Sequence, residues 1–222
     1  MNAIVEKIQV VLKRLTHMPV FVVLPRYRAT LENLTIELYV SQRKLPALAA
    51  ADALIVPVGP DLKMVSGVAK MARDRGADLV QYEANKVAPL LPGDVFIGTG
   101  ARYRYKYTAL AVIFDQSKRT SAELISQAIV NAVRKLRDLG AKSVVVADMT
   151  ENLLAQPNWI TVEQRRKTAA ITAKIIVDAI IACGSTARTI KIWCSEPDNA
   201  QFYVEELKHI HNRERAARAV HA

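Results

Sequence analysis

The sequence lacks long hydrophobic runs. Among its 222 residues, no apolar stretch reaches the roughly 20 residues that a membrane-spanning helix needs. The longest candidate, MPVFVVLP at residues 18–25, is short and bounded by prolines, which favours a buried strand. Residues 1–15 carry charges at helical spacing, without the uninterrupted apolar core and cleavage site of a signal peptide. We therefore expect a cytoplasmic protein that does not enter a membrane.

Cysteine and histidine are also scarce. The two cysteines, Cys183 and Cys194, lie on apolar patterns that are typical of buried free thiols, and a cytoplasmic location disfavours a disulfide. The four histidines, at positions 17, 209, 211 and 221, lie outside the loops that we consider for a site below. The sequence therefore gives little support to a Ser/His/Asp nucleophile, and we expect neither a metal nor a cofactor.

Acidic residues are outnumbered. There are 31 lysines and arginines against 21 acidic residues, and the net charge of +10 favours phosphate-bearing ligands, nucleic acid or an anionic surface. Hydrophobic residues make up 51% of the chain, which is ordinary for a folded domain. Part of the positive charge lies in the tail HNRERAARAVHA, which is also compatible with a solvated terminal helix.

Apolar segments with strand and helix patterns alternate along the second half of the chain. This alternation predicts a three-layer α/β/α sandwich with a mixed, mainly parallel sheet. Strands are expected near residues 20–24, 34–40, 53–58, 95–100, 107–114, 142–148 and 188–194, and helices near 3–15, 66–75, 77–91, 120–140, 161–184 and 199–213. We divide the chain into an N-terminal helix and strand addition (1–33), a main domain (34–212) and a basic C-terminal tail (213–222).

The stretch ADALIVPVGPDLKMVSGVAK, residues 51–70, leads from a strand through a loop into a helix that begins at Ser66-Gly67-Val68. The first amides of a helix lack internal partners, so this start could hold an anion. Alternatively, Ser66 only caps the helix and Gly67 allows close packing. Ligands bind at the carboxyl ends of strands in such sheets. We therefore expect the loops at 57–67, 99–107 and 148–158 to surround one crevice.

Two further segments could carry chemistry. Asp148, Glu151 and Asn152 follow a strand, where a carboxylate pair could act as a general base or hold a cation, or could cap the next segment and face water. The stretch ARYRYKY alternates cations with tyrosines. In an extended conformation it could stack bases and hold phosphates, or form a connection with tyrosines packed inward. The nucleic-acid hypothesis rests on Arg102, Tyr103, Arg104, Tyr105 and Lys106.

Several segments resemble the macrodomain family of ADP-ribose-binding modules. Asp52-Ala53-Leu54-Ile55 is similar to the family's DAIV, and Ser66-Gly67-Val68 to its GGV, at matching spacing. The stretches PGDVFIGTGARYRYKYTALAVIF, AKSVVVADMTENL and RTIKIWCSEPDNAQFYVEEL resemble later segments of the family, so that the resemblance covers residues 34–210. It implies a macrodomain-like sandwich that binds a nucleotide or ADP-ribose-type ligand.

The resemblance also shows departures. Val56 and Gly59 stand where the family has an asparagine pair, and glycine cannot orient the distal ribose, so ADP-ribose hydrolysis is disfavoured. Gln42 follows the early strand in place of an adenine-contacting aspartate, and Glu151 lies in the second phosphate loop, where it would repel a diphosphate. The ligand residues that the resemblance implies are Gln42, Gly59, Ser66, Gly67, Val68, Tyr103, Thr150 and Asn152.

Four functions are compatible with these features. The leading hypothesis is a divergent macrodomain-like protein that binds its ligand without hydrolysing it. The second is an RNA- or DNA-binding module that uses the basic, tyrosine-interleaved surface. The third is a scaffold or homo-oligomerisation domain, a role that a macrodomain-like fold has in leucine aminopeptidases. An enzyme that uses Asp148 or Glu151 comes last.

Overall fold

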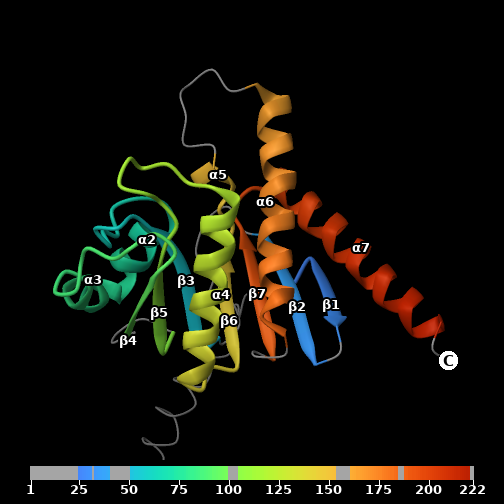
Figure 1. Ribbon diagram of the computed structural model, residues 1–222, viewed down its shortest axis with the longest axis horizontal. Helices are drawn as coiled ribbons and strands as arrows, with labels where there is room; N and C mark the ends of the chain where they lie inside the picture. Colours follow the sequence, from blue (N-terminus) through green and yellow to red (C-terminus); the bar gives the residue numbers. More distant parts are fainter. Residues whose placement is uncertain are drawn as a thin grey trace, which may run out of the picture.

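The computed structural model describes residues 25–31, 33–40, 51–99, 105–153, 161–184 and 188–220. These residues form a seven-stranded sheet with helices on both faces (Figure 1). The predicted α/β/α sandwich with a mixed, mainly parallel sheet is therefore confirmed. The helix expected at 3–15 and the strand expected at 20–24 lie outside the described residues.

Five neighbouring strands of the sheet are parallel, and antiparallel strands flank them. The strand order is β1-β2-β7-β6-β3-β5-β4, and only the pairs β1–β2 and β4–β5 are antiparallel. The carboxyl ends of the five parallel strands therefore share one edge, which we call the carboxyl edge, and the opposite side is the amino edge. The strands are β1 (Tyr27–Leu31), β2 (Leu34–Val40), β3 (Ala53–Val58), β4 (Val95–Thr99), β5 (Tyr107–Val112), β6 (Ser143–Ala147) and β7 (Thr189–Cys194).

The long helices begin at the caps that the sequence indicates. The side chain of Ser121 accepts a hydrogen bond from Leu124 N, 3.3 Å away, and Thr161 forms a capping box with Gln164. The helix expected at 66–75 ends at Gly76, where φ is 115°. The helices are α2 (Gly67–Ala72), the π-turn η1 (Arg73–Ala77), α3 (Asp78–Ala84), α4 (Ala122–Asp138), α5 (Thr150–Leu153), α6 (Val162–Ala182) and α7 (Pro197–Val220).

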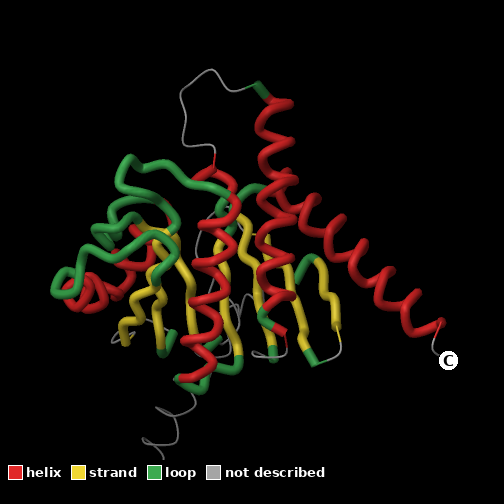
Figure 2. Tube along the Cα trace, viewed as in Figure 1, coloured by secondary structure: helices red, strands yellow, loops and turns green. Residues whose placement is uncertain are grey.

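Two apolar cores lie on the two faces of the sheet. Alternate strand residues such as Ile55 and Val146 pack against α4, α6 and α7, which cover one face. Their sequence neighbours, such as Val56 and Val145, pack with residues of α2 and α3 in the second core. Figure 2 shows α4 and α6 as red helices in front of the yellow strands. A Cβ atom on Gly98 of β4 would lie 2.7 Å from Val80 Cγ1, so this glycine allows α3 to approach the sheet closely.

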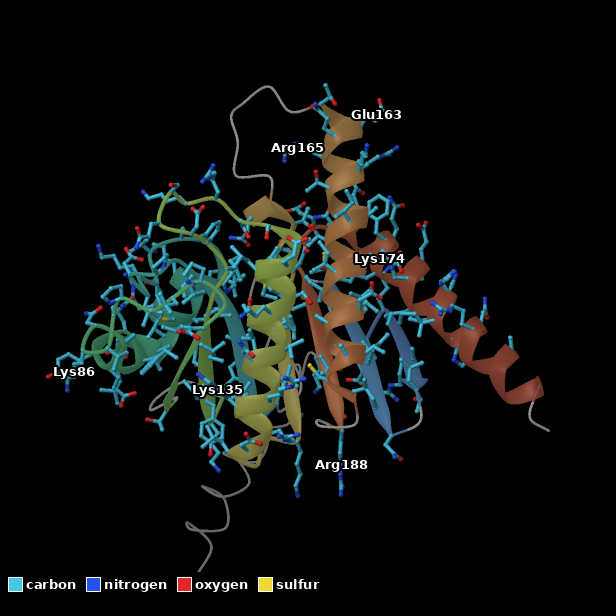
Figure 3. All side chains as sticks on the ribbon, in the orientation of Figure 1. Lys86, Lys135, Glu163, Arg165, Lys174 and Arg188 are labelled. Carbon is cyan, nitrogen blue, oxygen red and sulfur yellow. The ribbon has the colours of Figure 1, made fainter. Side chains whose placement is uncertain are left out.

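Helices α6 and α7 extend beyond the body of the sandwich (Figure 1). Residues 161–167, at the start of α6, are all exposed, and Glu163 and Arg165 mark this projecting end in Figure 3. Helix α7 continues without a break past residue 212, where we placed the boundary between domain and tail. None of the described helices combines the length and the apolar character that crossing a membrane requires.

Candidate functional site

Two segments with predicted ligand residues meet at the carboxyl edge. The first loop, residues 59–66, follows β3, and the second loop, residues 148–152, follows β6 and includes the start of α5. Strands β3 and β6 are neighbours and parallel, with Ala53 opposite Val144 and Ile55 opposite Val146. The topology therefore places these two loops side by side, as the sequence predicted for 57–67 and the start of 148–158.

The middle of the first loop is closed to a ligand. Leu62 N donates to Gly59 O at 2.9 Å, Lys63 N to Asp61 Oδ1 at 3.3 Å, and Met64 N to Gln81 Oε1 at 2.6 Å. The side chains of Leu62 and Met64 are fully buried in the core beneath α2 and α3. These contacts occupy the amides of residues 62–64, so the middle of the loop offers no free donor.

The end of the first loop and the start of α2 do offer such donors. Lys70 N, which bonds to Ser66 O, is the first helical amide with a partner. Within the described part of the chain, no acceptor is found for the amides of residues 65–69, and the Ser66 side chain makes no cap hydrogen bond. Ser66 and Gly67 are both exposed. This group of amides, which we call the open amides, is the strongest candidate for an anion site.

The conformation of Gly67 explains why a glycine stands there. Its φ of +51° is disfavoured for residues with a Cβ atom, while a Cβ atom added at this position would have no neighbouring atom within 4 Å. Ser66 occupies the N-cap position, but its side chain makes no cap hydrogen bond, and the alternative in which Gly67 allows close packing is wrong. Val68, the third predicted residue of this helix start, is half-buried.

Asp148 in the second loop is a centre of structural hydrogen bonds. Its Oδ1 accepts from Tyr203 OH at 2.7 Å, from Thr150 Oγ1 at 2.7 Å and from Thr150 N at 3.1 Å. Its Oδ2 accepts from Asn199 Nδ2 at 3.2 Å and lies 3.6 Å from the thiol of Cys194. Asp148 thus ties the end of β6 to β7, α5 and α7, which supports the capping role over that of a general base.

The groups around Asp148 remain protonated donors. Burial raises the pKa of the Tyr203 hydroxyl well above its usual value, and the charge of Asp148 raises it further. Burial and the same charge also raise the pKa of the Cys194 thiol. Both cysteines are free and buried, as expected.

The second loop has fewer donors left for a ligand than the resemblance implied. Thr150 is buried, and both its amide and its hydroxyl donate to Asp148. Asn152 N donates to Met149 O at 3.0 Å. The side chain of Glu151 and the residue Gln42 lie outside the described residues. Val56, at the family's first asparagine position, is fully buried in β3, and Gly59 directly follows that strand.

The connection from β4 to β5 begins and ends at the opposite edge. Because β4 is antiparallel to β5, Thr99 pairs with Tyr107 at the amino edge, where Tyr107 N also donates to Asp52 O at 3.1 Å. The expectation that the 99–107 loop borders the crevice is therefore wrong. Tyr105 is buried, and Lys106 Nζ lies 4.9 Å from the ring centroid of Tyr107. These contacts favour the interpretation with packed tyrosines. Arg102, Tyr103 and Arg104 lie outside the described residues.

Asp52 joins β3 and β6 at the amino edge. Its Oδ2 accepts from Lys142 N at 2.7 Å, from Ser143 N at 2.9 Å and from Ser143 Oγ at 3.1 Å. Partial burial alone would raise the pKa of Asp52, but these hydrogen bonds outweigh it and hold the pKa below its usual value. Asp52 thus fixes the strand register and lies far from the carboxyl edge.

We expect Asp52 to contribute acid-dependent stability. Its pKa is lower in the folded chain, so its stabilising effect is complete above the unfolded-state value of about 4 and is lost as the pH falls below it. The free energy of unfolding, measured by urea titration from pH 7 to pH 2.5, should therefore fall less steeply in Asp52→Asn than in the wild type. Equal slopes would show that Asp52 is not preferentially ionised in the folded state.

Comparison with known proteins adds to this geometry. Residues 57–159 match the family model of the Macro domain. The Oceanobacillus iheyensis macrodomain with ADP is similar in structure, with a TM-score of 0.68 and 15% identity over 84% of this chain and 97% of that one. The Trypanosoma brucei macrodomain in complex with ADP-ribose has a TM-score of 0.62 and 13% identity over 77% and 68%. The comparison with curated proteins found no match.

The family match and the similar structures both point to the macrodomain fold. At these identities the structural likeness establishes the fold alone, and the family match covers the segment that contains both loops of the carboxyl edge. Residues 57–159 therefore resemble the Macro domain family, and the fold is that of the similar macrodomain structures, as the sequence resemblance predicted.

Proposed function

We propose that this protein binds a nucleotide or ADP-ribose-type ligand at the carboxyl edge, with a phosphate held by the open amides of residues 65–69. The observation that carries this proposal is that the amides at the end of the first loop and the start of α2 have no acceptor in the described part of the chain. Exposed amide hydrogens at a helix start attract an anion because they carry partial positive charge and have no internal acceptor. The structures of similar macrodomains with ADP and ADP-ribose support the choice of ligand class.

Charge also favours an anionic ligand. The net charge of +10 raises the local concentration of anions. Strand β5 is the other neighbour of β3, and the loop after this strand carries the exposed residue Lys118. Lys63 of the first loop is exposed too, although it lies 3.4 Å from Asp61. Anions that approach the carboxyl edge therefore meet lysines on both loops.

We further propose that the ligand is bound without hydrolysis. Gly59 has no side chain with which to orient a ribose. Asp148, which we considered as a general base, is engaged by donors from its own chain. A base must reach the proton it removes with a free acceptor, and these contacts leave Asp148 poorly placed for that task.

Isothermal titration calorimetry tests the proposal. ADP-ribose, ADP, AMP and ATP are titrated into the full chain, and the same samples are analysed after long incubation for released products. We expect saturable binding with at least one of these ligands, and no product above the level of a protein-free control. Absence of heat and of a thermal shift with all four would exclude this function.

Nucleic-acid binding and homo-oligomerisation, the two alternative functions, stay predictions. Tyr105 is buried, so its ring cannot stack on a base. The nucleic-acid hypothesis therefore depends on Lys106 and on Arg102, Tyr103 and Arg104, which lie outside the described part of the chain. The projecting ends of α6 and α7 are compatible with a homo-oligomer, which light scattering tests. A cytoplasmic location rests on the sequence alone.

A further inference from the structure

We infer that Gln81 of α3 is a positioning residue that holds the first loop in the conformation from which the open amides project. The inference rests on the proposed function, because it concerns the same loop. Gln81 was not singled out by the sequence, where it is one polar residue on a helical pattern.

Gln81 binds the loop backbone with both atoms of its side-chain amide. Its Oε1 accepts from Met64 N at 2.6 Å, and its Nε2 donates to Leu62 O at 3.2 Å. The Nε2 group also donates to Asn85 Oδ1, one helical turn further along, at 2.8 Å. The two backbone contacts orient the amide, since Met64 N can only donate and Leu62 O can only accept.

The loop needs such a partner because it buries irregular backbone. Leu62 and Met64 insert their side chains fully into the core, and Leu62 adopts a φ of +56°, which is unfavourable for a residue with a Cβ atom. Neither a helix nor a strand pairs the backbone of residues 62 and 64. A buried amide or carbonyl without a partner costs free energy, and Gln81 supplies a partner to one group of each kind.

Met64 anchors the start of the exposed stretch. The open amides begin at Val65, directly after Met64, and end at Ala69, whose side chain is again buried. Both ends of this short stretch are thus anchored in the core between α2, α3 and the sheet. Release of residue 64 would free one anchor and let the backbone of residues 65–67 change its conformation.

The test compares Gln81→Met, which keeps the size but loses both hydrogen bonds, with Asn85→Ala, which removes only the outer contact. The readouts are amide hydrogen exchange of Met64 and the affinity for ADP-ribose, both on the full chain. In Gln81→Met we expect Met64 exchange to rise and affinity to fall by about tenfold or more each, because two hydrogen bonds to the loop are lost and one alone corresponds to as much as about tenfold. In Asn85→Ala both should stay within about twofold of the wild type.

A third variant separates positioning from general packing. Gln81→Glu can still accept from Met64 N, but its ionised carboxylate cannot donate to Leu62 O. Protonation restores that donor, so its affinity relative to the wild type at the same pH should recover as the pH falls toward about 4–5. A purely structural loss would not recover in this way.

The outcomes separate the two proposals. If Met64 exchange rises in Gln81→Met while no variant, including the wild type, binds ADP-ribose, the positioning role stands and the proposed function fails. If the wild type binds but Gln81→Met matches it in Met64 exchange and in affinity, the positioning role is overturned and the function stands. Where Gln81→Met is too unstable to purify, the pH dependence of Gln81→Glu decides in the same way.

Discussion

Replacing Asp148 with alanine should lower the free energy of unfolding by roughly 3 kcal/mol, because hydrogen bonds to a charged group contribute about 1.5–3 kcal/mol each and buried donors lose their acceptor. The donors left behind include the fully buried hydroxyl of Tyr203 and the buried hydroxyl of Thr150. Urea denaturation followed by circular dichroism measures this change.

A matched control is Asp138→Ala, since Asp138 is an exposed carboxylate at the end of α4 that pairs only with its neighbour Arg137 in the described contacts. Exposed pairs of this kind contribute about 0–1 kcal/mol. Tyr203→Phe removes one of the donors to Asp148, and the double variant should lose less than the sum of the two single changes. A value for Asp148→Ala as small as that of Asp138→Ala would contradict the structural role of Asp148.

Replacing Gly67 with valine should reduce ADP-ribose affinity by tenfold or more while the chain still folds. The φ of +51° at Gly67 is costly for a β-branched residue, by about 1–2 kcal/mol, so the backbone should leave this conformation and turn the open amides apart. Loss of one charge-assisted hydrogen bond to a phosphate corresponds to about tenfold in affinity. Calorimetry gives the affinity, and thermal unfolding confirms the fold.

Gly140→Val controls for the strain itself. Gly140 comes after α4 at the amino edge and has a φ of +81°, and a Cβ atom added there would likewise have no neighbouring atom within 4 Å. The substitution should therefore lower stability by a similar amount and leave ligand affinity unchanged. Equal losses of affinity in both variants would attribute the effect to general destabilisation and would remove the open amides from the binding site.

The sequence was most informative for elements that have a uniform apolar pattern or a Ser/Thr helix cap. The strands β3, β6 and β7 and the helices α4 and α6 appear close to their expected positions, because uniform apolar runs and Ser/Thr caps are local signals. The direction of β4 was not available from its residues. Pairing of Thr99 with Tyr107 is a non-local property of the sheet, and it places the described ends of the β4–β5 connection at the amino edge.

The candidate site was predicted in part. Ser66, Gly67 and Val68 lie at the expected helix start, since the change from a strand to a helix with an intervening loop is visible in the sequence. The roles of Asp148 and Gln81 depend on partners from distant segments: Asn199 and Tyr203 for the first, Leu62 and Met64 for the second. No local pattern encodes such contacts, and Asp148 was consequently also considered as a catalytic group.

The most direct test of the central claim is a titration of isotope-labelled protein with ADP-ribose, followed by the backbone amide signals in NMR spectra. The open amides of residues 65–69 should show the largest shifts within residues 59–72, and the amides of residues 62–64, which are already bonded within the protein, should change little. Saturable binding without shifts at residues 65–69 would contradict the assignment of the phosphate to these amides.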